Sequence, residues 1–356
     1  GSVDGKRGIV DGTAGVIYID PDEETEHRMR KARDAEKERA ELLRTLKGRQ
    51  NITLDGQPIL LYANIGNIRD LDAALQNDAG GIGLFRSEFL YLEREDFPSE
   101  EEQFQIYRAA AEAMGGKRVV IRTLDIGADK ECGYFGMEKE ENPALGCRAI
   151  RICLTRPEIF KTQIRALFRA SIYGEIAIMY PMITGLKEIR RIRELVEEAK
   201  QELDARGETY GNPEQGIMIE TPAAAIISDL LAGEVDFFSI GTNDLTQYLL
   251  AVDRQNSALD GFRDIYHPAV LRMIHLVVDN AHKAGIRAGI CGELAADAGL
   301  SWKQMFPNIG RCGRRNGSRL CKETQECHRS NSICRQGPEE GDTFPAGRST
   351  GDEYLA

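Results

Sequence analysis

The sequence contains no apolar run of the roughly 20 residues that a transmembrane helix requires, and its first residues do not resemble a secretion signal. It also has no excess of positive charge, because 46 Lys and Arg stand against 57 Asp and Glu, for a net charge of −11. Nucleic-acid-binding proteins usually carry a basic face, so this balance argues against that class. We therefore expect a cytoplasmic protein that contacts neither membranes nor nucleic acid.

Paired Cys-x-x-Cys motifs are also missing, although the chain has eight cysteines. In the absence of a secretion signal, we expect thiols rather than a disulfide framework. The composition turns to Arg, Ser, Gly and Cys after about residue 310. A zinc site in this tail is one interpretation, formed by His328 with Cys312, Cys321, Cys327 and Cys334. Their spacing is not that of the usual zinc motifs, which argues against it.

After residue 58 the chain alternates short apolar runs with helical segments. The runs are mostly uninterrupted, as expected for parallel strands that are buried on both faces. They cover residues 59–65, 81–85, 118–124, 176–182, 216–219, 237–240 and 288–291. The helical segments include residues 99–115, 158–171, 186–206, 222–232 and 268–284. This repetition predicts an α/β fold, the TIM-type (β/α)8 barrel, with seven of its eight strands visible and no clear candidate for the last.

Two segments at the start of the chain fall outside this pattern. Residues 8–21 predict two short strands around Gly-Thr-Ala-Gly, too small to hold a core alone and therefore the end of another domain. Residues 23–48 are dense in Glu, Lys, Arg and Ala, which predicts a long, solvated connector helix. We divide the chain into a domain remnant (1–21), a helical linker (22–49), the barrel (50–310) and an aberrant tail (311–356).

Polar residues recur where the apolar runs end. They are Arg86, Arg122, Glu220, Asn243, Asp244 and Cys291. In a parallel barrel the carboxyl ends of all strands lie on one face, which is where active sites form. Buried polar groups need partners, so their recurrence at corresponding positions favours a functional site over a role in the core.

Arginines are prominent among these residues. Arg86 and Arg122 each end a run, and Arg148, Arg151 and Arg254 follow later in the chain. A guanidinium group grips a carboxylate or phosphate with two parallel hydrogen bonds, so the group suits a small polyanion. The structural alternative is a salt bridge to the nearby Glu88 or Asp125.

Two carboxylates, Glu220 and Asp244, follow successive runs. Oxygen ligands in this number suit Mg²⁺, which keeps waters and shares its shell with a substrate phosphate, and no His or Cys cluster points to zinc or iron. Capping of the helix that begins at Thr221-Pro222 is the alternative for Glu220, but Thr221 can serve there. Cys291, in the segment Gly-Ile-Cys-Gly, is either a small buried hydrophobe or a general acid or nucleophile.

Six motifs together resemble enzyme I of the bacterial phosphoenolpyruvate-dependent sugar phosphotransferase system. They are GIGLFRSEFLY, RTLDIGADK, EENPALGCRAIRI, ETPAAA, DFFSIGTNDLTQYLLAVDR and CGELA, in the family's order within residues 60–297. Pyruvate phosphate dikinase and phosphoenolpyruvate synthase share the barrel and some motifs. RTLDIGADK and TQYLLAVDR are more similar to enzyme I.

The resemblance implies a role for each matching residue. Arg86, Arg122, Lys130 and Arg148 would hold the phosphate of phosphoenolpyruvate, and Asn243, Asp244 and Arg254 would also contact substrate. Glu220 and Asp244 would ligate Mg²⁺, and Cys291 would protonate the enolpyruvate carbon. The implied partners are the amino-terminal phosphohistidine domain of enzyme I and, through it, the phosphocarrier protein HPr. A cytoplasmic homodimer is also implied.

The sequence departs from the family in two places. None of its five histidines has the Thr-Ser-His context of the family's phosphoacceptor, so we expect a fragment that binds phosphoenolpyruvate without its own acceptor. The tail is the second departure. With one possible choice of codons, Arg311–Gly317 moved by one base reads Gly-Val-Asp-Glu-Glu-Met-Ala, which is similar to the family's entry into its eighth strand. A shift of reading frame is therefore our preferred interpretation, which the coding DNA would test. An inactive phosphoenolpyruvate-binding fragment or sensor stays an alternative.

Overall fold

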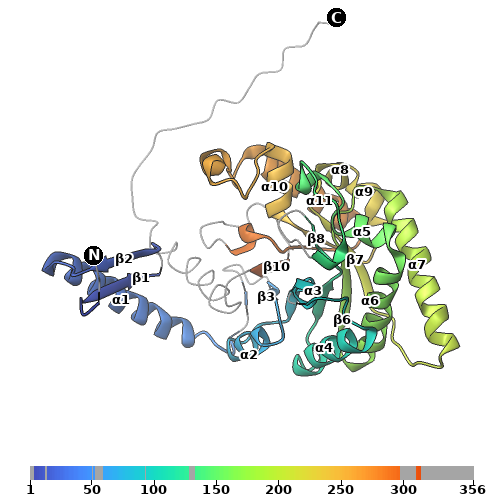
Figure 1. Cartoon of the computed structure of the whole chain (residues 1–356), viewed down its shortest axis with the longest axis horizontal. Helices are drawn as coiled ribbons and strands as arrows, with labels where there is room; N and C mark the ends of the chain where they lie inside the picture. Colours follow the sequence, from blue (N-terminus) through green and yellow to red (C-terminus); the bar gives the residue numbers. More distant parts are fainter. Residues whose placement is uncertain are drawn as a thin grey trace, which may run out of the picture.

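The computed structural model describes residues 4–12, 14–49, 51–52, 59–92, 94–127, 133–296 and 310–313. Within these ranges the chain forms a barrel surrounded by helices and, beside it, an N-terminal hairpin and long helix (Figure 1). In the described part of the chain, no helix is both long enough and apolar enough to span a bilayer.

Eight parallel strands close the barrel, each paired with two neighbours in the order β10-β3-β4-β5-β6-β7-β8-β9. The strands are β3 (Leu61–Ile65), β4 (Ile82–Arg86), β5 (Val119–Arg122), β6 (Ile176–Tyr180), β7 (Glu214–Ile219), β8 (Phe237–Ile240), β9 (Arg287–Ile290) and β10 (Gly310–Gly313). The first seven match the seven apolar runs, and the expected TIM-type barrel is confirmed.

The eighth strand, β10, begins at the last residue that the sequence assigned to the barrel and runs into the predicted tail. Gly310 pairs with Gly289 of β9, and Arg311 pairs with Leu61 of β3. The strand has the sequence GRCG, which contains no apolar run, and this is why hydrophobic patterning did not find it. The other residues of the proposed zinc site lie outside the described residues, so the zinc and reading-frame interpretations stay predictions.

Helices surround the barrel (Figure 1). They are α2 (Asp70–Gln76), α3 (Phe89–Leu92), α4 (Glu100–Ala113), α5 (Ile150–Thr155), α6 (Pro157–Ala170), α7 (Leu186–Ala205), α8 (Pro222–Ile226), α9 (Ser228–Ala232), α10 (Thr242–Leu250) and α11 (Pro268–Lys283). Where the sequence predicts a single helix over 222–232, the structure has two, because the backbone leaves helical geometry at Ile227. Thr221 caps α8 by accepting from the amide of Ala224, as expected.

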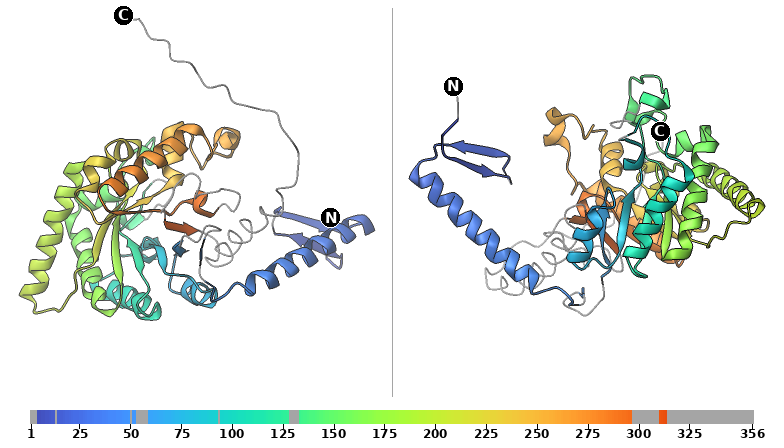
Figure 2. Two further views of the ribbon diagram at one scale, coloured as in Figure 1. Left: turned by 180° about the vertical axis from the view of Figure 1, so that it is seen from behind. Right: turned by 60° about the horizontal axis from the view of Figure 1, so that its bottom comes forward.

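The N-terminal segment consists of the antiparallel hairpin β1 (Gly8–Asp11) and β2 (Val16–Ile19), followed by helix α1 (Glu23–Arg44). Asp22 caps α1 by accepting from the amide of Thr25 at 2.8 Å, and acidic residues in the first turn suit the helix dipole. The helix extends away from the barrel and carries the hairpin near its far end (Figure 2). The expected pair of strands and the expected solvated helix are therefore present.

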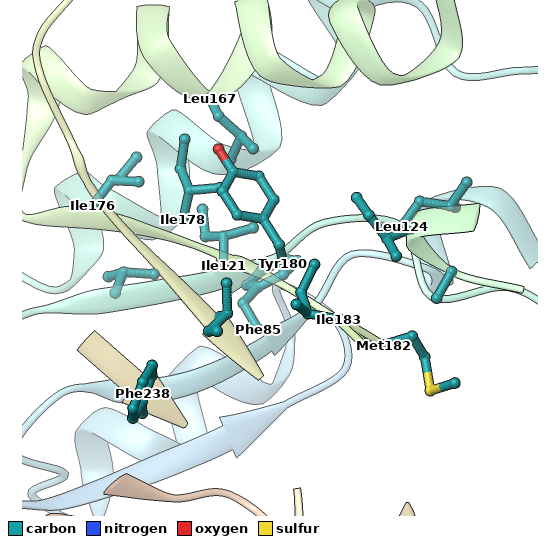
Figure 3. Packing of buried hydrophobic residues seen from close by; sticks show 14 of the residues in the cluster. Phe85, Ile121, Leu124, Leu167, Ile176, Ile178, Tyr180, Met182, Ile183 and Phe238 are labelled. Atoms are coloured by element: carbon teal, nitrogen blue, oxygen red, sulfur yellow. The ribbon is translucent and has the colours of Figure 1, made fainter. Parts of the chain in front are cut away.

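Buried side chains form two apolar layers. One lies between the strands and the helices and includes Ile121, Ile178 and Leu167 of α6, which packs close to Tyr180 (Figure 3). The other fills the barrel interior and includes Val120 and Met179. Successive strand residues point to opposite faces, so neighbours such as Val120 and Ile121 enter different layers. The filled interior leaves the carboxyl end of the barrel as the place for a site.

Candidate active site

The predicted site residues meet at the carboxyl end of the barrel. Arg86 ends β4 and pairs in register with Arg122, which ends β5. Glu220 directly follows β7, and Cys291 directly follows β9. Asn243 and Asp244 lie in the first turn of α10, which begins directly after β8.

These residues line one cavity of about 260 Å³. Its lining includes Arg86, Arg122, Glu220, Asn243, Asp244, Arg254 and Cys291. Predicted side chains from five strand ends, or from the segments after them, therefore converge on one cavity. A cavity of this size with charged groups of both signs suits a small ionic molecule rather than a polymer.

Arg122 is almost fully buried between two carboxylates. Its Nη2 donates to Oε1 of Glu88 at 2.6 Å, and its Nη1 lies 2.7 Å from Oδ2 of Asp125. Burial alone would lower the pKa of Arg122, but the charges of Asp125 and Glu88 outweigh burial and raise it. Arg122 therefore forms the salt bridges of the structural interpretation and also lines the cavity, as the functional interpretation requires. The ion pairs fix a permanent cation at the cavity wall.

Arg148 forms a second buried cation that joins two walls of the site. Its Nη2 lies 3.1 Å from Oδ1 of Asp125, and its Nη1 lies 3.2 Å from Oδ1 of Asp244. The hydroxyl of Tyr248 accepts from the same Nη1 at 3.2 Å and donates to the carbonyl of Ala144. Asp125 therefore connects Arg122 to Arg148, and Arg148 connects both to α10.

Arg86 and Arg254 are two further cations at the cavity. The guanidinium of Arg86 stacks on the ring of Phe89 at 4.7 Å from its centroid, which orients the group. Arg254 reaches Oδ1 of Asp244 at 3.7 Å, and the carboxamide oxygen of Asn243 accepts from the amide of Glu293 at 3.1 Å. Each of these polar side chains is thus held by a neighbour.

Glu220 is 1% exposed, and one of its oxygens accepts from the amide of Met182 at 2.6 Å. Burial, and then the charges of Asp244 and Asp125, raise the pKa of Glu220 well above its ordinary value. A Cβ at Gly241 would lie 2.8 Å from the other carboxylate oxygen, so only glycine leaves that oxygen its space. In the described part of the chain, no three His, Cys, Asp or Glu side chains are arranged to hold a metal ion.

Cys291 is buried at the cavity, and its thiol donates to the carbonyl of Ile240 at 3.5 Å. Burial raises the pKa of the Cys291 thiol to about 12. The thiol is therefore protonated at neutral pH, which is the state required of a proton donor. Cys147, Cys153 and Cys291 are all free thiols, as expected for the cysteines in the described part of the chain.

Three predicted arginine or lysine positions are absent from the described lining of the cavity. Arg148 lines a neighbouring cavity instead, and its guanidinium reaches the site through Asp125 and Asp244. Lys130 lies outside the described residues. Arg151 is absent from the described cavity lining and instead donates to the carbonyls of Leu145 and Gly146. The sequence did not single out several other residues that line the cavity: Asn64, Gln255, Arg263 and Glu293. Asn64 belongs to β3, so the rule of polar residues near strand ends could have found it.

A family model described as PEP-utilising enzyme, PEP-binding domain, matches residues 40–306. The chain belongs to this family. The phosphoenolpyruvate-protein phosphotransferase of Haemophilus influenzae is 50% identical over 292 residues, which are 81% of this chain and 50% of that protein. The protein of the same name from Staphylococcus epidermidis is 48% identical over 290 residues, 81% of this chain and 51% of that protein.

The chain thus spans about half the length of the curated relatives that it matches. Among solved structures, a citrate lyase from Burkholderia xenovorans superposes with a TM-score of 0.47 at 13% identity, over 82% of this chain and 88% of that chain. That likeness is too distant to bear on function. The family membership agrees with the resemblance that the six sequence motifs carry.

Proposed function

We propose that this chain is the phosphoenolpyruvate-binding half of an enzyme I, a phosphoenolpyruvate-protein phosphotransferase. The observation that carries the proposal is the cavity at the carboxyl end of the barrel, where Arg86, Arg122 and Arg254 face Glu220 and Asp244. A substrate with one phosphate and one carboxylate needs cationic side chains that bind it and carboxylate ligands that hold a metal ion. The match to the PEP-binding domain family supports the same substrate.

The arginines would bind the phosphate. Each guanidinium presents paired donors that fit phosphate oxygens, and transfer of a phosphoryl group requires mainly positioning and charge stabilisation. Arg122 is held by Glu88 and Asp125 before substrate arrives, so little reorganisation accompanies binding. Arg148 would add charge from the other wall, and Lys130 would assist as the family resemblance implies.

Glu220 and Asp244 would hold Mg²⁺. The donor set fits Mg²⁺, because both side chains are carboxylates that line one cavity. Repulsion from the charges of Asp244 and Asp125 raises the pKa of Glu220 beyond the effect of burial, and a bound cation would relieve this repulsion. When bound, Mg²⁺ supplies positive charge beside the substrate's phosphate and carboxylate. Two protein ligands leave room for water and substrate oxygens, which Mg²⁺ commonly retains.

Cys291 would complete the reaction. Breaking the bond between phosphorus and the bridging oxygen moves the phosphoryl group to an imidazole nitrogen and leaves the enolate of pyruvate. The Cys291 thiol then gives its proton to the terminal carbon of that enolate, which yields pyruvate and a thiolate that solvent reprotonates. A thiol whose pKa burial raises to about 12 keeps its proton until such a strong base forms beside it.

The acceptor imidazole would come from a separate amino-terminal domain. His27, His267, His275 and His282 are described, and none of them lines the cavity. We propose that residues 1–21 are the remnant of that domain, 22–49 the linker, 50–310 the barrel and 311–356 an aberrant tail. The whole enzyme would pass the phosphate to HPr in the first step of sugar uptake, as a cytoplasmic homodimer.

Calorimetric titration with phosphoenolpyruvate, with and without Mg²⁺, tests the proposal. We expect saturable binding that Mg²⁺ strengthens, and we expect Asp244→Ala to abolish the Mg²⁺ dependence. Absence of binding by the folded protein would contradict the proposal that phosphoenolpyruvate is the substrate. Unchanged Mg²⁺ dependence in the variant would contradict the assignment of Asp244 as a metal ligand. Transfer of phosphate to the histidine domain of a pyruvate phosphate dikinase, rather than of an enzyme I, would assign the chain to that related group.

A further inference from the structure

Behind strands β4 and β5, a chain of hydrogen-bonded polar side chains is buried among apolar residues. Gln163 of α6 is its centre and is 0% exposed. Its carboxamide oxygen accepts from the amide of Leu124 at 2.9 Å. Its nitrogen donates to the hydroxyls of Ser87 at 2.9 Å and Tyr107 at 3.0 Å.

In this network of side chains, the donor and acceptor roles of all the hydrogen bonds are mutually consistent. Ser87 accepts from Gln163 and donates to the carbonyl of Arg122 at 2.6 Å. Tyr107 accepts from Gln163 and donates to the carboxamide oxygen of Gln103 at 3.1 Å, and Gln103 donates to the carbonyl of Pro98 at 3.1 Å. Both hydrogens of the Gln163 amide and both hydroxyl hydrogens are used. A fully satisfied buried network of this kind fixes one arrangement of its members.

Helix packing alone does not require these residues. The neighbours Phe160, Ile164 and Leu167 on the same helix are fully buried and apolar, and a leucine at 163 would have a similar volume. A buried amide costs free energy unless it is hydrogen-bonded. A glutamine at this position is therefore explained by nearby polar groups that require a hydrogen-bond partner. Those groups are backbone atoms at the end of β5. Strand β4 ends at Arg86, and beyond that point the carbonyl of Arg122 bonds to the Ser87 side chain.

The atoms that the network holds are adjacent to the residues of the cavity. Ser87 lies between Arg86 and Glu88 in sequence, and its hydroxyl holds the carbonyl of Arg122. The amide of Leu124 directly precedes Asp125. The network therefore fixes the backbone from which the two cavity arginines, Arg86 and Arg122, and the two carboxylate partners of Arg122 project.

We propose that Gln163 is a positioning residue for the phosphate-binding arginines: through Ser87 and the backbone at Arg122 and Leu124, it sets the spacing of the β4 and β5 ends. The inference rests on the proposed function, because it assumes that these arginines bind phosphoenolpyruvate. Gln163 itself contacts no ligand. Displacement of binding groups by a fraction of an ångström is costly, since substrate binding needs several groups in place at once.

The test compares phosphoenolpyruvate binding by the full chain and by Gln163→Leu, measured by calorimetry in Mg²⁺. We expect the variant to remain folded and its Kd to rise roughly tenfold to a hundredfold. Tyr107→Phe removes one of the three Gln163 hydrogen bonds and keeps the ring against Phe85, so its Kd should rise less. If Gln163→Leu does not fold, Tyr107→Phe decides: a Kd equal to that of the wild type would overturn the proposal.

Asn280→Leu is the matched control. Asn280 is another buried amide, and it donates to the hydroxyl of Ser228 at 2.9 Å between α11 and α9, away from the cavity. We expect it to lower Tm with unchanged affinity. The readout that separates positioning from stability is the rise in Tm on adding phosphoenolpyruvate, taken relative to each variant's ligand-free Tm. That rise should shrink for Gln163→Leu and persist for Asn280→Leu.

The outcomes are distinct from failure of the proposed function. If the wild type does not bind phosphoenolpyruvate, the proposed function fails and the inference fails with it. If the wild type binds, and Gln163→Leu binds equally well or Asn280→Leu loses as much affinity, only the positioning role is wrong. Graded loss in Tyr107→Phe and Gln163→Leu with an unaffected control supports it.

Discussion

Cys291 shows how one buried atom can carry a chemical role that packing does not explain. Its thiol lies on the same cavity as Arg122 and Glu220, and burial raises its pKa to about 12. A buried apolar residue would fill the same space beside Gly292. The protonated thiol is useful only where a strong base is formed, which is the enolate in the proposed reaction.

We expect Cys291→Ala to leave the affinity for phosphoenolpyruvate within about twofold and to slow formation of pyruvate by roughly a hundredfold or more, since general acids contribute that much. The measurement is pyruvate release with an enzyme I phosphohistidine domain supplied separately. Cys153→Ala removes another buried thiol, outside the described cavity lining, and should turn over normally. Full activity of Cys291→Ala would show that another group protonates the enolate.

Tyr248 offers a second test at this scale, because a single hydroxyl connects Arg148 to the carbonyl of Ala144. Tyr248→Phe keeps the ring and removes both hydrogen bonds. A hydrogen bond of this kind contributes about 0.5–1.5 kcal/mol, so we expect the Kd for phosphoenolpyruvate to rise about twofold to tenfold. Tyr210→Phe is the control: its hydroxyl donates to Asp204 at 3.0 Å on an exposed surface, and its removal should not change the Kd. If both variants bound phosphoenolpyruvate with the same Kd, the Tyr248 hydroxyl would not contribute to binding through Arg148.

Among the elements, α4 and α6 are joined by a charged network as well as by their apolar faces. Glu100 at the start of α4 receives Nε of Arg165 at 2.6 Å and Nη1 of Arg169 at 2.9 Å, both from α6. Nη1 of Arg206, which follows α7, also lies 2.9 Å away. Partial burial opposes ionisation of Glu100, but hydrogen bonds from Arg165, Arg169 and Arg206 outweigh it and lower its pKa.

A carboxyl group with a lowered pKa in the folded state stabilises the fold above its unfolded-state pKa, and that contribution is lost as the pH falls through the folded-state pKa. Glu100→Gln should therefore lower the free energy of unfolding by about 1–2 kcal/mol at pH 7. The difference from the wild type should shrink below about pH 4. Urea unfolding at several pH values measures this. Glu194→Gln, which breaks the exposed pair with Arg191, should change little. A difference that stays constant with pH would rule out the ion pairs as its cause.

The strands and helices also show what patterning can predict. The run over 176–182 became β6 and the segment over 186–206 became α7, because both bury apolar residues with the period of their structure. The short strand β10 has no such pattern and is specified by the two neighbours that it pairs with. The break at Ile227 has no sequence signal such as Gly or Pro, and a tertiary contact lies next to it, the hydrogen bond from Asn280 to Ser228.

The site follows the same division. Arg122 and Asp244 were predictable because strand ends share one face of a barrel. The ion pairs of Arg122 with Glu88 and Asp125 were also open to prediction, because both carboxylates lie near the arginines in the sequence. The contact of Arg148 with Asp244 was not, because it joins residues 96 positions apart. Gln163 was hidden for another reason: on an amphipathic helix, a single polar residue at a buried position has the appearance of an exception until its partners are known.

At the scale of the whole molecule, the site depends on closure of the barrel. Its groups come from β3, β4, β5, β7, β8 and β9 or the turns that follow them, so any relative movement of the strands changes the cavity. Strand β10 alone connects β9 to β3. Cys291 and Asn64 stand on opposite sides of that connection, which makes a four-residue strand important for the geometry of the site.

A chain that ends at residue 309 lacks β10 and leaves the edges of β9 and β3 unpaired. We expect it to have a Tm lower by at least about 5 °C, to associate through the exposed edges, and to bind phosphoenolpyruvate weakly or not at all. A chain that ends at residue 320 retains β10 and is the control, with Tm and affinity expected near those of the full chain. Thermal unfolding, size-exclusion chromatography and calorimetry measure the three effects. If both shortened chains matched the full chain, β10 would contribute nothing to closure, and seven strands would be enough to hold the site. If both shortened chains lost stability and binding equally, the loss would come from the residues after 320, which both chains lack. The presence of β10 in the longer of the two would then make no difference.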